Sequence, residues 1–267
     1  MAGKMGRALV QAIFETKDLR LGAAFESASS PVIGMDAGEF AGVGKLDVKV
    51  GDLKNGNLSQ TDIIIDFSIP EATLALAELC KSQDKGMVIG TTGFEKDQLR
   101  YLEECSANIP IFMSPNMSVG VNVLFKLVRM ASEAFGEEVD CEIFEAHHSQ
   151  KIDAPSGTAV RIGEILADSR SVDMKNVGKY GREGLVGKRK QQEIGFSSIR
   201  GGDIVGDHTV FFIGEGERVE ITHRAQSRVN FAQGAIRAAR FLSDKKNGLY
   251  DLSLIHISEP TRLGMIS

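Results

Sequence analysis

The spacing of hydrophobic and polar residues divides the first part of the chain into alternating helices and short strands. Apolar residues on one face predict a helix over residues 7–16 and another over 95–106. Between them, Ser68 is the expected N-cap of a helix whose first turn contains Pro70. Short strands are predicted over residues 19–25, 63–67, 87–89 and 109–113, and the continuous apolar run that begins at residue 63 is typical of a strand buried on both faces of a parallel sheet. Repeated strand–helix–strand units predict an α/β fold with a doubly wound parallel sheet, which binds ligands at the carboxyl ends of its strands.

A different pattern begins near residue 119. Apolar helices are predicted over residues 119–134, 158–168 and 231–242. Strands are predicted over residues 140–146, 194–200, 205–213 and 218–223. Gly-rich turns separate the last three strands, which favours an antiparallel or mixed sheet and hence a second, α+β domain over 119–228. The first domain then spans residues 1–118, and residues 229–252 return to it.

The composition is that of a globular chain and excludes several classes of function. The 267 residues are 42% hydrophobic and 25% charged, with a net charge of −5. That balance does not fit a nucleic-acid-binding surface, so local features must hold any anionic ligand. Cys80, Cys105 and Cys141 are scattered, which favours reduced thiols over disulfides or a zinc site. No apolar run reaches the roughly 18 residues of a membrane span and no signal peptide is visible, so we expect a soluble, cytoplasmic protein without a membrane partner.

A short glycine-containing segment opens the first predicted helix. Residues 3–6 (Gly-Lys-Met-Gly) form either a plain helix-entry turn or a nucleotide-binding loop. Glu26 favours the loop, because it lies twenty residues beyond Gly6 at the end of a predicted strand, where dinucleotide-binding folds place a carboxylate for the adenosine ribose. An exposed loop charge is the alternative for Glu26. Ser27 is not a cation, so a ribose phosphate has no obvious partner and NADH is favoured over NADPH.

Two further loops each follow an apolar strand. They are Gly-Thr-Thr-Gly at residues 90–93 and Ser-Pro-Asn-Met at residues 114–117. Both lie where the carboxyl edge of a parallel sheet would face a bound nicotinamide. Taken singly, each sequence is also that of an ordinary strand-to-helix turn.

The segment 145–159, EAHHSQKIDAPSGTA, contains the strongest candidates for chemistry. Backbone N–H groups at the start of the following helix form an anion site, with the hydroxyls of Ser156 and Thr158 as additional donors. Lys151 supplies a positive charge, and His147 and His148 can titrate near physiological pH. The cluster suits a small carboxylate substrate that must also receive a proton.

Other interpretations of these segments stay open. His147 and His148 are adjacent on a predicted strand and point to opposite faces, so such a pair rarely binds one metal ion. Another interpretation is that the two histidines have only a structural role beside an ordinary capped helix. Residues 200–203 (Arg-Gly-Gly-Asp) and 206–208 (Gly-Asp-His) are interpreted first as tight turns between strands.

Together these motifs resemble the 4-hydroxy-tetrahydrodipicolinate reductase (dihydrodipicolinate reductase) family of bacterial lysine biosynthesis. The most specific match is E-A-H-H-x-x-K-x-D-A-P-S-G-T-A at residues 145–159. Shorter matches are GKMGR at 3–7, GTTGF at 90–94, SPNMSVGVN at 114–122, RGGDIVGDH at 200–208 and EITHRA at 220–225. The resemblance runs from about residue 2 to residue 251.

The resemblance implies an NAD(P)H-dependent oxidoreductase with a Rossmann-like domain and a mixed-sheet domain that binds substrate and assembles homotetramers. In that family a hydride passes from the nicotinamide to a cyclic imine dicarboxylate, the ring is then protonated, and no metal is required. His147 matches the family's general acid and Lys151 its lysine donor. His148, Gly157 and Thr158 match positions that hold the substrate carboxylates, and Ser156 joins them as part of the anion site. The candidate cofactor contacts are Gly3, Lys4, Met5, Glu26, Gly90, Thr91, Thr92, Ser114, Pro115, Asn116 and Met117.

Two features depart from the family pattern. Members begin with a strand and a further glycine ahead of the GKMG match, whereas this chain starts at Met1, so we expect the first strand of the sheet to be truncated. Its loss would leave backbone groups of neighbouring strands unpaired. A non-catalytic nucleotide-binding protein or an inert fragment is therefore the alternative function, and a zinc hydrolase is a third. Residues 253–267 fit no family ending and are expected to be a non-native tail.

Overall fold

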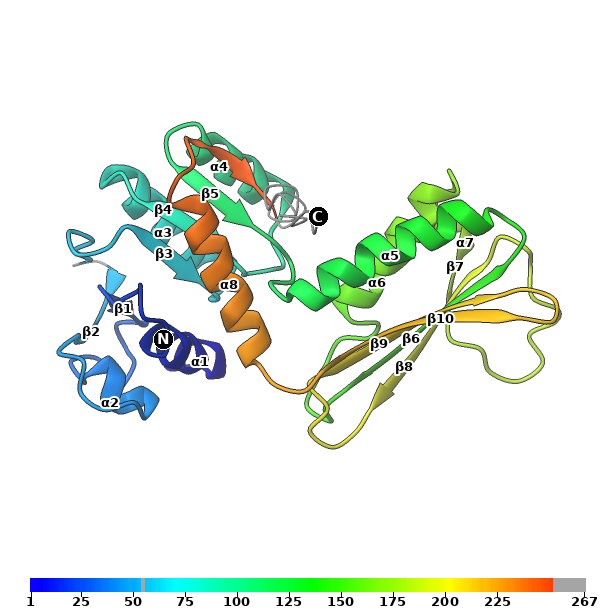
Figure 1. The fold of residues 1–267 in the computed structure, drawn as a ribbon, viewed down its shortest axis with the longest axis horizontal. Coiled ribbons are helices and arrows are strands. Elements are labelled where there is room, and N and C mark those ends of the chain that lie inside the picture. The colour runs from blue at the N-terminus through cyan, green and yellow to red at the C-terminus, as the bar shows by residue number, and fades with distance from the viewer. Residues whose placement is uncertain (54–55, 252–267) are drawn as a thin grey trace, which may run out of the picture. The chain divides into compact units, whose positions relative to one another are not determined.

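The computed structural model describes residues 1–53 and 56–251, and the chain forms two compact units (Figure 1). Unit 1 comprises Met1–Met117 and the described chain from Val229 onward, and unit 2 comprises Ser118–Arg228. The expected non-native tail, residues 253–267, lies outside the described residues.

Unit 1 contains two parallel sheets. The larger has the strand order β11-β5-β4-β3, and the smaller pairs β1 with β2. The strands are β1 (Ala24–Phe25), β2 (Val50–Gly51), β3 (Ile63–Asp66), β4 (Gly86–Ile89), β5 (Pro110–Met113) and β11 (Gly248–Tyr250). The helices are α1 (Lys4–Phe14), α2 (Ala37–Ala41), α3 (Pro70–Ser82), α4 (Lys96–Ser106) and α8 (Val229–Leu242).

Helices cover both faces of the larger sheet (Figure 1). Every residue of β4 is buried, which explains its unbroken apolar sequence. Val88 packs in one cluster with residues of α1 and α8, whereas its neighbours Met87 and Ile89 pack in another with residues of α3 and α4. This arrangement confirms the predicted α/β fold with a Rossmann-like parallel sheet.

The start of α1 differs from the prediction. The helix begins at Lys4 and not at residue 7, because Gly3 is its extended N-cap. Gly6 then packs against the backbone of Met1, where an added Cβ would lie 2.1 Å from the carbonyl oxygen. Only a residue without a side chain fits this close approach.

Other local predictions for unit 1 were wrong at element ends. Ser68 is not the N-cap of α3; Ile69 holds that position because Pro70 is the first helical residue. Of the strand predicted over residues 19–25, only Ala24 and Phe25 pair with another strand in the described part of the chain. The short elements α2, β2 and β11 were not predicted.

Unit 2 contains a five-stranded mixed sheet with the order β10-β9-β6-β8-β7. The pairs β6–β8 and β7–β8 are parallel, and β9 is antiparallel to both β6 and β10. The strands are β6 (Asp140–His147), β7 (Gly178–Tyr180), β8 (Ile194–Arg200), β9 (Gly206–Ile213) and β10 (Arg218–Ala225). The helices are α5 (Val119–Phe135), α6 (Gly157–Ser169) and α7 (Met174–Val177). This sheet confirms the predicted second α+β fold, although α7 and β7 were not predicted.

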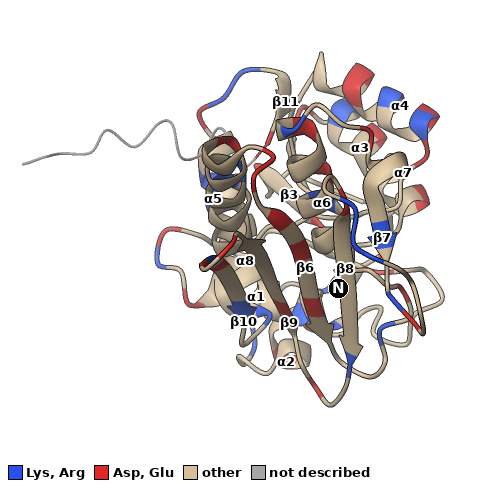
Figure 2. Cartoon of the chain, turned by 90° about the vertical axis from the view of Figure 1, so that its right-hand side faces the viewer, with Lys and Arg blue, Asp and Glu red and all other residues tan. Residues whose placement is uncertain are grey.

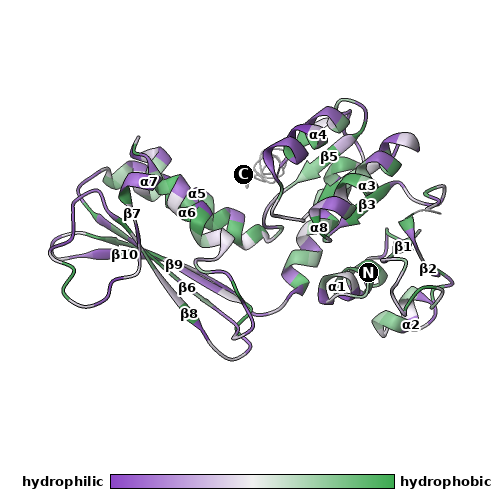
Figure 3. Ribbon diagram, turned by 180° about the vertical axis from the view of Figure 1, so that it is seen from behind, coloured by the Kyte–Doolittle hydropathy of each residue, from purple (hydrophilic) through white to green (hydrophobic). Residues whose placement is uncertain are grey.

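The two faces of the sheet in unit 2 differ. One face packs against α5 and α6, whose apolar residues are visible in Figure 3, and its core includes Ile143, Ile162 and Phe212. Because side chains alternate along a strand, Phe144 and Phe211 lie on the opposite face. Figure 2 shows β10, β9, β6 and β8 side by side, with acidic residues along β6.

Candidate active site

The carboxyl end of β6 carries two buried ionisable residues. Alternate side chains of this strand face the helices, so Cys141 and Ile143 join the core and Glu145 and His147 continue the same row. Glu145 is 1% exposed and His147 is 9% exposed. A buried charge is stable only when it is paired or hydrogen-bonded, and neighbouring elements supply those partners.

Glu145 lies at the centre of these contacts. Arg200, the last residue of β8, binds both carboxylate oxygens, with Nη1–Oε2 at 2.8 Å and Nη2–Oε1 at 2.7 Å. The backbone N–H of Ser156 donates to Oε1 at 3.2 Å, and Nδ1 of His147 lies 2.6 Å from Oε2. Burial acts to raise the pKa of Glu145, but hydrogen bonds from Arg200, Ser198 and His147 lower that pKa to about 2. The carboxylate is therefore ionised at neutral pH.

The His147 ring lies between Glu145 and β9. Burial lowers the pKa of His147, and the contact with Glu145 acts in the opposite direction. Because the carboxylate is ionised, the ring nitrogen that faces it, Nδ1, carries a hydrogen. Nε2 lies against Gly206, where an added Cβ would be 3.0 Å away. A side chain at position 206 would therefore press against the His147 ring, so glycine is what fits there.

His208 on β9 packs edge-on against His147, with the ring centroids 5.1 Å apart. It is 3% exposed. Burial first and then the neighbouring His147 lower the pKa of His208 to about 3, so this ring is uncharged at neutral pH. Its Nε2 lies 2.9 Å from Oγ of Ser156, which also accepts the N–H of Ala159 as the N-cap of α6. The Ser156 hydroxyl, predicted to donate to an anion, thus has partners within unit 2.

The first turn of α6 opens to solvent beside these residues. Gly157 is exposed, and a Cβ added to it would meet no atom within 4 Å, so a ligand has room to approach the backbone there. Thr158 follows and is half-buried. Lys151 lies in the loop between β6 and α6, where its Nζ contacts Asp153 at 2.8 Å. His148 begins this loop, and its carbonyl accepts the N–H of Lys151.

Unit 2 therefore brings together the residues that the sequence predicted to bind and protonate a substrate. Three other residues of this region were not predicted as site residues: Glu145, Arg200 and His208. The available signal was an ionisable residue within or at the end of a predicted strand, with glycines close to Arg200 and His208. That signal is also typical of ordinary turns, which is how residues 200–203 and 206–208 were interpreted.

In unit 1, the carboxyl ends of β3 and β4 meet at one edge of the larger sheet. The N–H of Gly90 donates to the carbonyl of Asp66 at 2.8 Å. Thr91 is buried; its hydroxyl donates to Oδ2 of Asp66 at 2.9 Å and accepts the N–H of Ser68 at 2.9 Å. A Cβ added to Gly90 would lie 2.3 Å from the Phe67 ring. Asp66 and Phe67, which were not predicted as site residues, thus hold this loop in place.

The loop after β5 lies at the same edge. The N–H of Ser114 donates to the carbonyl that ends β4, and its hydroxyl donates to the carbonyl of Asn116 at 2.9 Å. Met117 is 1% exposed and packs in the core with residues of α1 and α8, so its side chain is not at the surface. Pro115 and Thr92 are exposed. Both predicted loops therefore meet at one sheet edge.

Glu26 directly follows β1 in the smaller sheet. Its Oε2 accepts hydrogen bonds from the amino group of Met1 at 2.8 Å and from the N–H of Ala2 at 2.6 Å. The N–H of Ser27 lies 3.1 Å from Oε1. Burial acts to raise the pKa of Glu26, but these hydrogen bonds lower it to about 2. The predicted ribose-binding carboxylate is thus ionised, and the amino terminus contacts one of its oxygens.

The start of α1 is a second open helix N-terminus. Gly3 is its N-cap and has no side chain to cap the helix, and a Cβ added there would meet no atom within 4 Å. Lys4 is exposed, and Met5 is half-buried against the core. Open backbone N–H groups with a helix dipole behind them favour phosphate groups.

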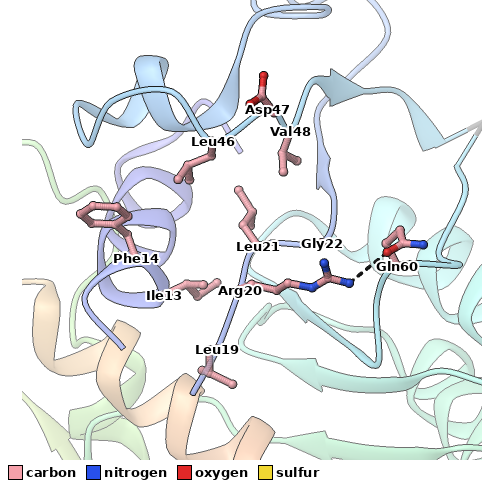
Figure 4. A pocket seen from close by; sticks show the side chains of 10 residues that line it. All are labelled: Ile13, Phe14, Leu19, Arg20, Leu21, Gly22, Leu46, Asp47, Val48 and Gln60. Atoms are coloured by element: carbon pink, nitrogen blue, oxygen red, sulfur yellow. Dashed lines mark hydrogen bonds between the residues drawn. The ribbon is translucent and has the colours of Figure 1, made fainter. Parts of the chain in front are cut away.

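A cavity of about 410 Å³ lies elsewhere in unit 1 (Figure 4). Its walls come from the end of α1, residues 19–22 and residues 46–48. The side chains are mostly aliphatic, and the guanidinium of Arg20 donates to Oε1 of Gln60 at 2.9 Å. None of the predicted site residues lines this cavity, so it does not bear on the chemistry.

Metal ligands and membrane segments were searched within residues 1–53 and 56–251. These residues contain no group of three or more His, Cys, Asp or Glu side chains arranged to hold a metal ion. None of the helices in the same ranges has both the length and the apolar character needed to cross a bilayer. Cys80, Cys105 and Cys141 are buried and free.

Comparison with known proteins gives matches for both units. The family model for the N-terminus of dihydrodipicolinate reductase matches residues 1–117, and the model for its C-terminus matches residues 120–255. The chain is 52% identical over 251 residues to a 4-hydroxy-tetrahydrodipicolinate reductase from Syntrophotalea carbinolica, which is 94% of each chain. It is 48% identical to the one from Saccharophagus degradans, with the same coverage.

A solved structure has a similar fold. It is the dipicolinate-bound dihydrodipicolinate reductase from Paenisporosarcina sp. TG-14, with a TM-score of 0.71 and 24% identity. The match covers 93% of this chain and 94% of that one. At this identity the likeness shows a shared two-domain fold.

Proposed function

The chain belongs to the dihydrodipicolinate reductase family, and from that premise we propose that it reduces 4-hydroxy-tetrahydrodipicolinate to tetrahydrodipicolinate. The 4-hydroxyl group leaves as water, which gives dihydrodipicolinate, and this dehydrated form takes up the hydride and the proton. The protein is an NAD(P)H-dependent oxidoreductase of lysine and diaminopimelate biosynthesis. The observation that carries this function is the buried Glu145–His147 pair beside the open first turn of α6. A proton donor and an anion site then lie in the same region, as reduction of a cyclic dicarboxylate requires.

Substrate binding falls to the first turn of α6 and to the loop before it. Backbone at Gly157 and Thr158 faces one carboxylate of the substrate, because helix N-termini favour anions. Lys151 and His148 lie in the adjoining loop and contribute positive charge and a hydrogen bond. These contacts orient the ring for proton transfer, and orientation of this kind lowers the barrier of the chemical step.

Proton transfer to the substrate falls to His147. Its Nδ1 is bound to Glu145, so Nε2 is the nitrogen that takes up a proton and delivers it. The ionised Glu145 stabilises the charged ring at the moment of transfer. Lys151 stabilises negative charge that develops on the substrate.

The residues of unit 1 fit a pyridine dinucleotide. Gly3 leaves the start of α1 open to a pyrophosphate, and Glu26 directly follows β1, at the position where dinucleotide-binding folds place a carboxylate for the ribose hydroxyls. Gly90, Thr91 and the loop after β5 lie at the carboxyl edge of the sheet, which is the usual place for the nicotinamide. When bound, the reduced nicotinamide supplies the hydride.

We propose that NADH is preferred over NADPH. A 2′-phosphate beside Glu26 would face a carboxylate, and Ser27 offers it no positive charge. The ratio of kcat/KM for the two cofactors measures this preference directly. Ser27→Arg is expected to move the ratio toward NADPH, and an unchanged ratio would contradict the role of this position.

We propose that the protein assembles as a homotetramer through unit 2. The sheet face opposite α5 and α6 carries Phe144 and Phe211, and Ile199 is 49% exposed. Apolar side chains on an open sheet face favour contact with another copy of the chain. Light scattering should then give four times the chain mass of 28.9 kDa, and Phe211→Asp should lower it.

These proposals assign a different role to each domain. Residues 1–118 with 229–252 bind the dinucleotide, and residues 119–228 bind the substrate and form the assembly. We place the enzyme in the cytoplasm, where free cysteines such as Cys80 and Cys141 stay reduced. The alternative of a non-catalytic or inert fragment is not favoured, because family models match both domains.

Turnover with the expected substrate tests the proposed function. The substrate is generated freshly by dihydrodipicolinate synthase, and oxidation of NADH and NADPH is followed by absorbance. The expected result is rapid oxidation that depends on both the substrate and the protein and is lost in His147→Gln. No oxidation with either cofactor would contradict the proposal.

A further inference from the structure

We propose that Glu145, held by Arg200, is the positioning residue that fixes the orientation and the tautomer of His147, so that Nε2 is the nitrogen that transfers the proton. This inference rests on the proposed function, because it assigns a second layer of residues to the same site. None of the sequence motifs required these residues to meet. The contacts that carry it come from β6, β8 and the first turn of α6.

The hydrogen bonds of Glu145 fix the orientation of its carboxylate group. Oε2 faces Nδ1 of His147 at 2.6 Å and Nη1 of Arg200 at 2.8 Å. Oε1 accepts from Nη2 of Arg200 at 2.7 Å and from the N–H of Ser156 at 3.2 Å. A carboxylate bound at both oxygens cannot rotate without breaking several of these contacts. Because Arg200 binds both oxygens, it fixes the orientation of the Glu145 carboxylate, and that carboxylate in turn holds Nδ1 of His147.

Arg200 is itself held in place. Its Nη2 donates to the carbonyl of Asp153 at 2.7 Å, and its Nη1 donates to the carbonyl of Ile199 at 2.6 Å. These contacts join Arg200 to the loop that also carries Lys151. The guanidinium thus connects the strand end of β8, the carboxylate of β6 and the substrate-binding loop.

The same carboxylate connects the proton donor to the anion site. Ser156 donates its N–H to Glu145 and caps α6 with its hydroxyl, one residue before Gly157. Loss of Glu145 would therefore disturb the nitrogen that donates the proton and the turn that faces the substrate carboxylate.

The charged groups around His147 shift its pKa in opposite directions. Glu145 on β6 raises the pKa of His147, whereas Lys151 in the loop and Arg200 on β8 lower it. His208 on β9 packs against the ring and is uncharged at neutral pH. Removal of the carboxylate charge should therefore lower the pKa of His147, and removal of the guanidinium should raise it. These two shifts report whether the carboxylate and the guanidinium both face the ring, whereas the tautomer of His147 and kcat report the positioning role.

Two variants and one spectroscopic measurement test the inference. The imidazoles are labelled with ¹⁵N, and two-bond ¹H–¹⁵N correlations report the tautomer and the pKa of His147, assigned with His147→Gln. We expect the Nδ1–H tautomer in the wild type. Glu145→Gln should lower the pKa of His147, and Arg200→Met should raise it. In the reductase assay Glu145→Gln should lose about 100-fold in kcat.

Glu142→Gln is the matched control. Glu142 lies on the same strand and forms a bidentate pair with Arg182, with both N–O distances 2.8 Å. Glu142 also accepts from Nε of Arg189 at 3.0 Å. Its substitution removes a bidentate arginine contact on the same strand, at a more exposed position, without touching His147. The control should leave the tautomer, the pKa of His147 and kcat unchanged. Thermal melting of each variant shows whether the fold is kept, and Arg200→Lys tests whether one charge without the bidentate geometry is enough to restore kcat.

The two arms separate this inference from the proposed function. An Nδ1–H tautomer in the wild type, with pKa shifts of opposite sign, supports the positioning role even if no substrate is turned over. An Nε2–H tautomer in the wild type, or shifts of the same sign in the two variants, overturns it. Active wild-type enzyme with an unchanged kcat in folded Glu145→Gln also overturns it. If the wild-type protein shows no reductase activity but the spectroscopic results are as expected, the proposed function is contradicted and the positioning role is not.

Discussion

Glu145 in unit 2 and Glu26 in unit 1 are both carboxylates with a pKa of about 2, but different partners hold them ionised. Glu145 is 1% exposed, and Arg200 on the neighbouring strand binds both of its oxygens. The side chain of Glu26 is 23% exposed, and Oε2 contacts the amino group of Met1. In one unit the carboxylate is enclosed by the sheet, and in the other it lies at the surface beside the start of the chain.

The two carboxylates illustrate two ways in which the residues of a binding site are held in place. In unit 2, the buried side chains of β6 and β9 and the half-buried Arg200 of β8 contact one another, so we expect each to matter for placing the reacting atom. In unit 1, the loops are held by backbone contacts such as that between Gly90 and Asp66 and by hydroxyl contacts of Thr91 and Ser114. We therefore expect substitutions in unit 2 to affect kcat and the substrate KM, and substitutions in unit 1 to affect mainly the cofactor KM.

The largest effect is expected at the proton donor. His147→Gln and Lys151→Ala should each lower kcat by about 10²- to 10⁴-fold, because general acid catalysis contributes on that scale. The cofactor KM should change little. Steady-state kinetics with saturating NADH measures both values, and an unchanged kcat in both variants would show that unit 2 does not supply the proton.

The acid stability of unit 2 should depend on Glu145. A carboxyl whose pKa falls from 4.5 to about 2 on folding stabilises the folded state above pH 4.5 and loses that contribution as the pH falls toward 2. The shift corresponds to about 3 kcal/mol. Urea unfolding between pH 6 and pH 2.5 should show this loss in the wild type and a smaller one in the double variant Glu145→Gln/Arg200→Met, which leaves neither partner unpaired. Equal slopes in the two proteins would contradict the burial of Glu145 as an ionised group.

A methyl group at the anion site should weaken substrate binding by about tenfold. A Cβ added to Gly157 meets no protein atom within 4 Å, and the residue is in the first turn of α6, so Gly157→Ala should fold normally. The methyl would occupy the space in which a substrate carboxylate approaches. Tenfold in KM corresponds to about 1.4 kcal/mol. An unchanged KM in a variant with an unchanged melting temperature would show that the substrate binds elsewhere.

The smallest effect is expected at Glu26. Glu26→Gln removes a charge that would bind the adenosine ribose, and one hydrogen bond is worth about 1 kcal/mol, or roughly fivefold in cofactor KM. The substrate KM should not change. An unchanged cofactor KM would contradict a contact between Glu26 and the ribose. The contrast with Glu145→Gln, which should alter kcat, tests the difference between the two units.

Local sequence signals predicted the parts of the site that lie close together in the chain. His147, Lys151 and Gly157 fall within a dozen residues, and the start of a helix among them marks an anion site. The alternation of apolar strands and amphipathic helices likewise predicted the α/β fold of unit 1. Each of these signals depends on neighbours within one or two turns of helix.

The missing parts depend on contacts that no local pattern contains. Arg200 lies 55 positions from Glu145, and His208 lies 52 positions from Ser156. They meet because β8 and β9 flank β6 in the sheet, and the strand order cannot be derived from the strands one at a time. Ser68 shows a smaller limit: the sequence predicts a helix start in this region, but the N-cap is Ile69 and not Ser68, because Pro70 is the first helical residue.

The fate of a labelled hydride tests the central claim most directly. NADH that carries deuterium at the transferred position of C4 is oxidised by the enzyme in ordinary water with the freshly generated substrate, and the product is analysed by mass spectrometry and NMR. We predict one deuterium on a ring carbon of tetrahydrodipicolinate, formed at a rate that falls in His147→Gln. Oxidation of the cofactor without deuterium in the product, or equal rates in the two proteins, would contradict a reductase whose proton donor is His147.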